Sequence, residues 1–153
     1  MLEFIVMKRF TFFIGMVLGA LLLAVTTQAS AQKEKKFLLA QEDLKWEQLK
    51  GAPPGVMSAA LRGDQTKGGY EGLTKFPAGF KTPLHYHTYA TKIVVIKGLY
   101  THNGKKYGPG SYLYIPGGDK HETAGAEDSE SIFYIEQQGP FDLTLVEPVK
   151  ANK

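Results

Sequence analysis

Two histidines one residue apart, His85 and His87, are the first candidates for chemistry in this sequence. They lie in the segment TPLHYHTYATKIVVIKG (82–98), whose β-branched and aromatic residues are typical of strands. Because side chains at positions i and i+2 of a strand share a face, both imidazoles are expected on one side of a sheet. Such a pair can bind a divalent metal ion. A solvent-facing pair at a strand end is the simpler interpretation of this spacing taken alone.

A third histidine favours the metal-binding interpretation over the solvent-facing one. His121 lies in the segment GPGSYLYIPGGDKHETAG (108–125), which contains a short strand pattern followed by a Pro-Gly turn. A chain that returns after this turn would bring His121 beside the first pair, and three converging imidazoles form a metal site with open positions. The sequence has no cysteine, so a metal site must use histidine, carboxylate or backbone ligands.

The residues around these histidines resemble the two sequence motifs of the cupin family, G-x5-HxH-x3,4-E-x6-G and G-x5-PxG-x2-H-x3-N. The matching positions are Gly79, His85, His87 and Gly98 in the first motif and Gly110, Pro116, Gly118 and His121 in the second, where Gly125 replaces the Asn. The chain is similar to small single-domain bacterial cupins, including ChrR-like ones. The resemblance implies an all-β double-stranded β-helix, or jelly-roll barrel. It also implies one divalent metal ion, Fe, Zn or Mn, held by the three histidines.

The position of the carboxylate ligand in the first motif holds no acidic residue. It is filled by Thr91 if three residues follow the second histidine, or by Lys92 if four do, and the six-residue gap to Gly98 favours Thr91. A metal ion with three neutral ligands keeps its full charge and attracts anions, so we expect a small anionic organic ligand. Thr91, Lys92, Tyr112 and Tyr134 are the residues expected to line its pocket.

Several functions remain open at this point, and no catalytic residue can be assigned. Metal-dependent oxygenase chemistry and Lewis-acid chemistry both suit the resemblance. The alternatives are a non-catalytic module that binds a small ligand or metal, and a metal-free isomerase or epimerase with His, Tyr or Lys92 as acid and base. His102 precedes a turn and is expected to be exposed, and Glu122 is expected to face away from the pocket.

The elements that would position these residues are short strands. Runs of Val, Ile, Tyr, Phe and Thr alternate with Gly, Pro and Asn, which predicts a small all-β barrel. Strands are expected at 56–62, 70–76, 81–87, 91–102, 105–107, 112–115, 131–136 and 141–146. Asn103-Gly104 suits a two-residue hairpin turn. One short helical turn is expected within 38–49.

The first 31 residues have the layout of a secretory signal peptide, with Met7 as an alternative start. Lys8 and Arg9 precede an apolar run at 10–25, and Ala29-Ser30-Ala31 forms a cleavage pattern. The run is shorter than the about 20 residues of a spanning helix, which argues against a membrane anchor. We therefore expect a signal peptide at 1–31, an N-terminal arm at 32–50 and a barrel domain at 51–150, located in the periplasm or secreted.

The charge of the chain argues against a nucleic-acid partner. Removal of residues 1–31 would lower the formal net charge of +3 by one unit, because this segment contains Glu3, Lys8 and Arg9. The remainder is nearly balanced and has no strong basic patch in its sequence. The expected partner is a small anionic molecule, with no membrane contact after cleavage. A homodimer is left open.

Overall fold

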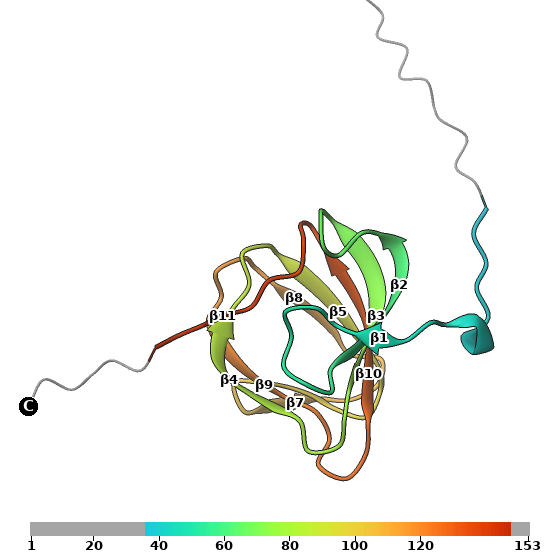
Figure 1. Cartoon of the computed structure of the whole chain (residues 1–153). Coiled ribbons are helices and arrows are strands. Elements are labelled where there is room, and N and C mark those ends of the chain that lie inside the picture. The colour runs from blue at the N-terminus through green and yellow to red at the C-terminus, as the bar shows by residue number, and fades with distance from the viewer. Residues whose placement is uncertain (1–35, 148–153) are drawn as a thin grey trace, which may run out of the picture. The chain divides into compact units, whose positions relative to one another are not determined.

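The computed structural model describes residues 36–147. Two antiparallel sheets in this range face each other and form a barrel (Figure 1). The first sheet has the strand order β1-β2-β3-β10-β5-β8, and the second has the order β11-β4-β9-β6-β7. The strands are β1 (Glu47–Gln48), β2 (Met57–Gly63), β3 (Tyr70–Phe76), β4 (Lys81–Tyr86), β5 (Thr91–Lys97), β6 (Tyr100–His102), β7 (Lys105–Tyr107), β8 (Tyr112–Ile115), β9 (His121–Ala124), β10 (Ser131–Gln137) and β11 (Thr144–Leu145). A 3-10 helix at Gln41–Asp43 precedes them and confirms the predicted helical turn.

Alternation of buried and accessible residues defines the inside of the barrel. Along β10, and along β5 as far as Val95, every second side chain is buried, because successive strand residues point to opposite faces. Phe133 is fully buried and lies opposite Val95, and both belong to the main hydrophobic cluster. The two sheets therefore pack through an apolar interior, on which the site is built.

The predicted strands agree best with the structure in the middle of the chain. The ranges 70–76, 105–107 and 112–115 coincide with β3, β7 and β8. The prediction of one strand over 91–102 is wrong, because Gly98 adopts a positive φ of 73° and separates β5 from β6. Asn103 and Gly104 have φ values of 47° and 80°, which confirms the predicted hairpin turn.

Two further differences concern β9 and the end of the domain. Strand β9 was not among the predicted strands, because its short sequence HETA carries little apolar alternation. The predicted strand at 141–146 is reduced to β11, and the residues before it form an irregular segment.

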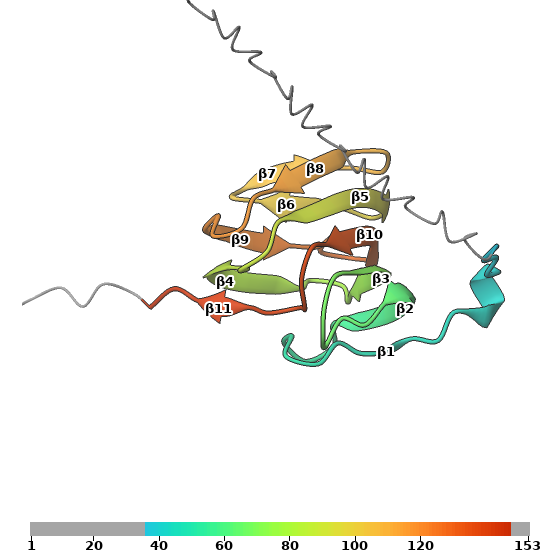
Figure 2. The ribbon, with the colours of Figure 1, turned by 90° about the horizontal axis from the view of Figure 1, so that it is seen from above.

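One end of the barrel is covered by irregular chain. The loop between β1 and β2 passes across this end (Figure 1), and its residues Leu49 and Val56 form a small buried cluster with Phe80. Phe141, in the segment between β10 and β11, packs against both this cluster and the main one. Figure 2 shows β11 lying beside β4, with which it pairs. We call residues 138–146 the C-terminal strap.

The predicted signal peptide, residues 1–31, lies outside the described residues. Across residues 36–147, no helix is long and apolar enough to cross a bilayer.

Candidate metal centre

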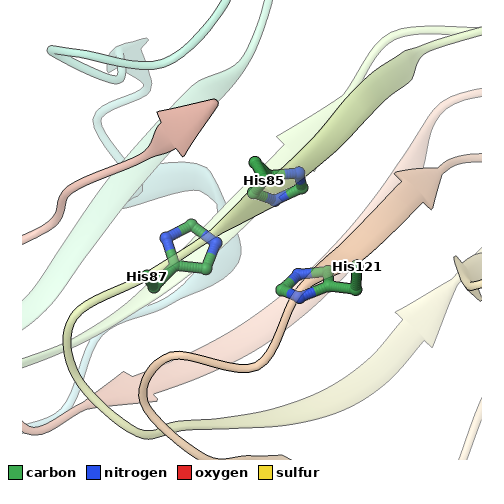
Figure 3. Close-up of side chains that lie close together, drawn as sticks. All are labelled: His85, His87 and His121. Carbon is green, nitrogen blue, oxygen red and sulfur yellow. The ribbon is translucent and has the colours of Figure 1, made fainter. Parts of the chain in front are cut away.

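Three histidines, two on the neighbouring strands β4 and β9 and one just after β4, converge inside the barrel (Figure 3). His85 on β4 lies directly opposite His121 on β9, and His87 follows immediately after β4. The ring centroid of His121 is 4.4 Å from that of His85 and 5.7 Å from that of His87. The centroids of His85 and His87 are 5.1 Å apart. One ring nitrogen of each lies within 4.8 Å of the others, a spacing that could hold a metal ion.

Backbone carbonyls fix the tautomer of each ring. Nδ1 of His85 lies 2.8 Å from the Pro83 carbonyl oxygen, and Nδ1 of His121 lies 3.1 Å from that of Asp119. Nδ1 of His87 donates in the same way to the Asp142 carbonyl. A carbonyl only accepts hydrogen bonds, so each Nδ1 must carry the proton and each Nε2 keeps a lone pair. This is the arrangement usual for metal-binding histidines.

Burial keeps two of the rings neutral. His85 and His121 are only 2% and 1% exposed. Desolvation lowers the pKa of His121 to about 4 and also lowers the pKa of His85, while hydrogen bonds to the carbonyls oppose the shift. Nε2 of His121 is buried and has no hydrogen-bond partner. A neutral, orphaned nitrogen in this position fits a divalent metal ion, which needs unprotonated ligands.

The structure places Thr91 at the carboxylate position of the first motif. Thr91 is buried and faces inward, and its hydroxyl donates to Oε1 of Gln137 at 3.1 Å. Gln137 lies opposite it on β10 and donates from Nε2 to the Pro140 carbonyl at 2.8 Å. A neutral hydroxyl–amide pair therefore occupies the position at which the first motif has a carboxylate.

Three residues expected in the pocket lie on the outer face of the sheet, so these predictions are wrong. Lys92 follows the inward-facing Thr91 and therefore points outward, where its ammonium lies 2.7 Å from Glu136. Tyr112 is 60% exposed. Tyr134 alternates with the inward-facing Phe133 and does not line the cavity described below.

The prediction of an exposed His102 is also wrong. This ring stacks on His121, with centroids 4.6 Å apart and planes inclined by 25°. Oδ2 of Asp119 lies 3.3 Å from Nε2 of His102 and 3.4 Å from Nδ1 of His121. His102 lies two residues after the inward-facing Tyr100 and therefore shares the same face of β6. This alternation in the sequence could have predicted that His102 is covered.

Unsatisfied polar atoms concentrate in this cluster. Within residues 36–147, three buried side-chain atoms have no hydrogen-bond partner: Nδ1 of His102, Oδ2 of Asp119 and Nε2 of His121. His102, Asp119 and His121 also offer donor atoms within 4.8 Å of one another. Only His121 of these lines the central cavity, however, whereas all three histidines of the first set do. His102 and Asp119 therefore lie behind the candidate centre.

The C-terminal strap positions His87. Besides the Asp142 carbonyl, which accepts from His87, the Asp142 carboxylate accepts from the Thr88 backbone N–H at 3.0 Å and from the Thr88 hydroxyl. The Phe141 ring centroid is 5.7 Å from that of His87. Sequence reasoning missed Asp142, and no signal could have found it, because its contact with His87 spans 55 residues and uses the backbone.

A cavity with a volume of about 70 Å³ adjoins the three rings. Apolar and aromatic side chains from both sheets form most of its wall, and Thr91 and Gln137 contribute polar groups. The half-buried residues Pro53, Phe141 and Leu143 lie at its wall from the irregular end of the barrel. The arrangement is a small apolar chamber with three converging nitrogen ligands.

A two-sheet antiparallel barrel of this kind is a jelly roll, the fold found in cupins. This chain belongs to the family described as a domain of unknown function (DUF4437), whose profile matches residues 37–152. A curated relative, the DNA damage-repair/toleration protein DRT102 of Arabidopsis thaliana, is 34% identical over 87 residues. That match covers 53% of this chain and only 27% of the relative's length.

Solved structures confirm the predicted jelly-roll fold. An RmlC-like cupin protein of Ralstonia eutropha is 24% identical, with a TM-score of 0.57 over 69% of each chain. The polyketide cyclase RemF of Streptomyces resistomycificus is 19% identical, with a TM-score of 0.61 over 76% of this chain and 89% of its own. The anti-sigma protein ChrR of Rhodobacter sphaeroides, solved with SigE, is 20% identical, with a TM-score of 0.53 over 65% and 52%.

Proposed function

We propose that this protein binds one divalent metal ion through His85, His87 and His121 and uses it to bind a small anionic organic molecule. The observation that carries the proposal is the tautomer of the three rings. Each Nδ1 donates to a carbonyl, so three lone pairs remain on rings that converge at one cavity.

The residues around the centre favour an anionic ligand. Thr91 and Gln137 form a neutral pair at the carboxylate position, so three neutral histidines would leave the charge of a bound cation uncompensated. A bound ion would supply Lewis-acid chemistry if it is Zn or Mn, or oxygenase chemistry if it is Fe. The protein's own residues hold the ligand set in place and surround it with an apolar wall that excludes water.

The fold is compatible with both an enzyme and a binding module. RemF is by its name a polyketide cyclase, whereas ChrR is an anti-sigma protein. Loss of the ligand with formation of a product would identify an enzyme. The alternative of a metal-free isomerase loses Lys92 as a candidate acid or base, because this side chain lies on the outer face.

The metal site is tested by metal analysis of the full chain purified without a histidine tag. We expect about one divalent ion per chain, and loss of the ion from His85→Ala and His121→Ala, because each removes one of three ligands. A metal-free wild-type protein that also fails to take up added Fe, Zn or Mn would contradict the proposal.

A matched pair of variants tests the empty carboxylate position. Thr91→Glu places a carboxylate inside the barrel and should increase metal affinity about tenfold or more, since it adds charge and an oxygen donor. Lys92→Glu introduces a glutamate on the opposite face of the same strand and should change metal affinity little. Calorimetric titration of both variants with the same metal gives the comparison. Equal effects would show that position 91 does not face the ion.

A further inference from the structure

The wall of the cavity beside the three histidines carries no formal charge of its own. Within the described part of the chain, its 22 lining residues include no Lys, Arg, Asp or Glu. Apart from the imidazoles, the polar lining groups are hydroxyls of Thr and Tyr and the amide of Gln137. Gln137 already accepts from Thr91 and donates to the Pro140 carbonyl, so its hydrogen bonds are made within the protein.

This wall has a consequence for the charge of a ligand. One anionic group could be compensated at the three-histidine centre, which on the proposed function holds a divalent cation. A second anionic group would lie against Phe, Ile, Leu and Val side chains without a cationic partner. Burial of an unpaired charge in apolar surroundings is strongly unfavourable.

The size of the cavity limits the rest of the ligand. Its volume of about 70 Å³ is well below the range of about 300–1,000 Å³ that is usual for drug-sized ligands. Large buried or half-buried rings, among them Phe133, Tyr100 and Phe141, occupy much of the space between the sheets. A ligand of a few carbon atoms suits this volume better than a sugar acid or a nucleotide does.

We infer that the cavity selects short, apolar organic monoanions, such as aliphatic carboxylates or enolates of a few carbon atoms, and excludes dicarboxylates and phosphates. The position of the single negative charge rests on the proposed metal centre. The rejection of a second charge rests on the wall alone, so the two parts can fail separately.

Butyrate and succinate form a matched pair of probes, because they have the same four-carbon chain and differ by one carboxylate. Calorimetric titration of the zinc-loaded full chain should show succinate binding at least about tenfold more weakly than butyrate, as one uncompensated buried charge requires. Butanamide, the neutral analogue, should also bind more weakly than butyrate. Succinate binding as tightly as butyrate, or no binding of butyrate, would overturn the inference.

The same titrations on chelator-treated protein separate this inference from the proposed function. Butyrate should bind much more weakly without metal. Equal butyrate binding with and without metal would contradict the proposed metal centre, and a retained preference over succinate would still support the uncharged wall.

A charge introduced at the wall provides the second test. Leu143→Lys places a cation at a lining position of the strap that is half-buried and lies outside both hydrophobic clusters. This variant should narrow the difference between butyrate and succinate severalfold, because the second carboxylate gains a partner. Leu143→Gln is the control, which is polar and of similar length but uncharged, and it should keep the wild-type preference. An unchanged preference in Leu143→Lys would contradict the inference.

Discussion

His121 has different surroundings on its two nitrogens. Nε2 is buried and has no hydrogen-bond partner, while Nδ1 donates to the Asp119 carbonyl with the Asp119 carboxylate 3.4 Å away. The backbone carbonyl fixes the orientation of the ring, and the carboxylate places a negative charge near it that would favour a cation bound at Nε2. Asp119 therefore brings negative charge near the centre from behind one ligand, at a site where Thr91 brings none.

Replacement of Asp119 tests this role. Asp119→Asn keeps the shape of the side chain and the backbone carbonyl but removes the charge, so metal affinity should fall by about tenfold or less, as the loss of one nearby opposite charge predicts. Asp128→Asn, in an exposed loop, removes the same charge far from the ring contacts and should leave affinity unchanged. Isothermal titration with zinc measures both variants, and equal affinities for the two would contradict the role of Asp119.

The lowered pKa of His121 predicts a pH dependence of the metal-free protein. The folded pKa is about 4 and the unfolded value is 6.5, so between these values the unfolded state binds more protons. The free energy of unfolding should therefore decrease as the pH falls below 6.5, by on the order of 3 kcal/mol in total for this one group once the pH is below 4.

Urea unfolding in the presence of a chelator, from about pH 7 to about pH 5, measures this decrease while most carboxylates remain ionised. In His121→Asn the decrease should be smaller, because the titrating group is gone. The same pH dependence in both proteins would show that His121 is not the source.

The spacing of the histidines, together with the resemblance to the cupin motifs, was enough to predict which three rings come together. His85 and His87 share a strand face, and the Pro116-x-Gly118 turn returns His121 to them, so local geometry carries most of the information. Alternation along β5 turns Thr91 inward and Lys92 outward. This agrees with the six-residue gap to Gly98, which favoured Thr91 for the carboxylate position. Asp119 and Asp142 act through their backbone carbonyls on histidine rings, and no residue pattern reports such contacts.

At the scale of elements, the turn at Gly98 connects the two sheets. This glycine has a φ of 73°, and it separates β5 in one sheet from β6 in the other. Beside it, the buried Ser131 hydroxyl oxygen accepts from the Leu99 N–H at 3.1 Å and from the Ala126 N–H at 2.9 Å. One side chain on β10 thus fixes both the turn and the loop that follows β9.

Two glycine variants separate backbone strain from crowding at this turn. Gly98→Ala and Gly104→Ala both place a side chain at positive φ, which costs about 1–2 kcal/mol. A Cβ at position 98 would also lie 2.5 Å from Oγ of Ser131 and 2.8 Å from the Glu130 carbonyl oxygen, whereas position 104 is open. Gly98→Ala should therefore lower the free energy of unfolding by about 3 kcal/mol or more. Chemical denaturation of both variants measures the difference, and equal losses would contradict the crowding.

Strands could be predicted where the alternation of apolar and polar residues is clear, but not where the strand is too short to show it. Strands β3 and β8 alternate between buried and accessible residues, and their predicted bounds agree with the structure. Strand β9 has only four residues, and its register is imposed by β4 and β6 on either side. The split at Gly98 required knowledge of φ, because the residues on both sides favour strands.

At the scale of the whole molecule, export remains a prediction of the sequence. Cleavage after Ala31 would give material that begins at Gln32, because the small residues at 29 and 31 form the recognition pattern. N-terminal sequencing of protein from the periplasm or medium of a bacterial expression host measures this. An intact 10–25 segment in the membrane fraction would instead indicate an anchored protein.

The C-terminal strap makes the order of synthesis relevant to the metal centre. All three histidines leave the ribosome before the Asp142 carbonyl that orients His87, and before β11 pairs with β4 beside His85. A nascent chain that already contains every ligand therefore lacks the contact that holds one of them in place. Because domains fold as units, the complete centre forms only when the end of the barrel has been made. On the proposed function, metal capture would therefore begin only after the strap has been synthesised and packed.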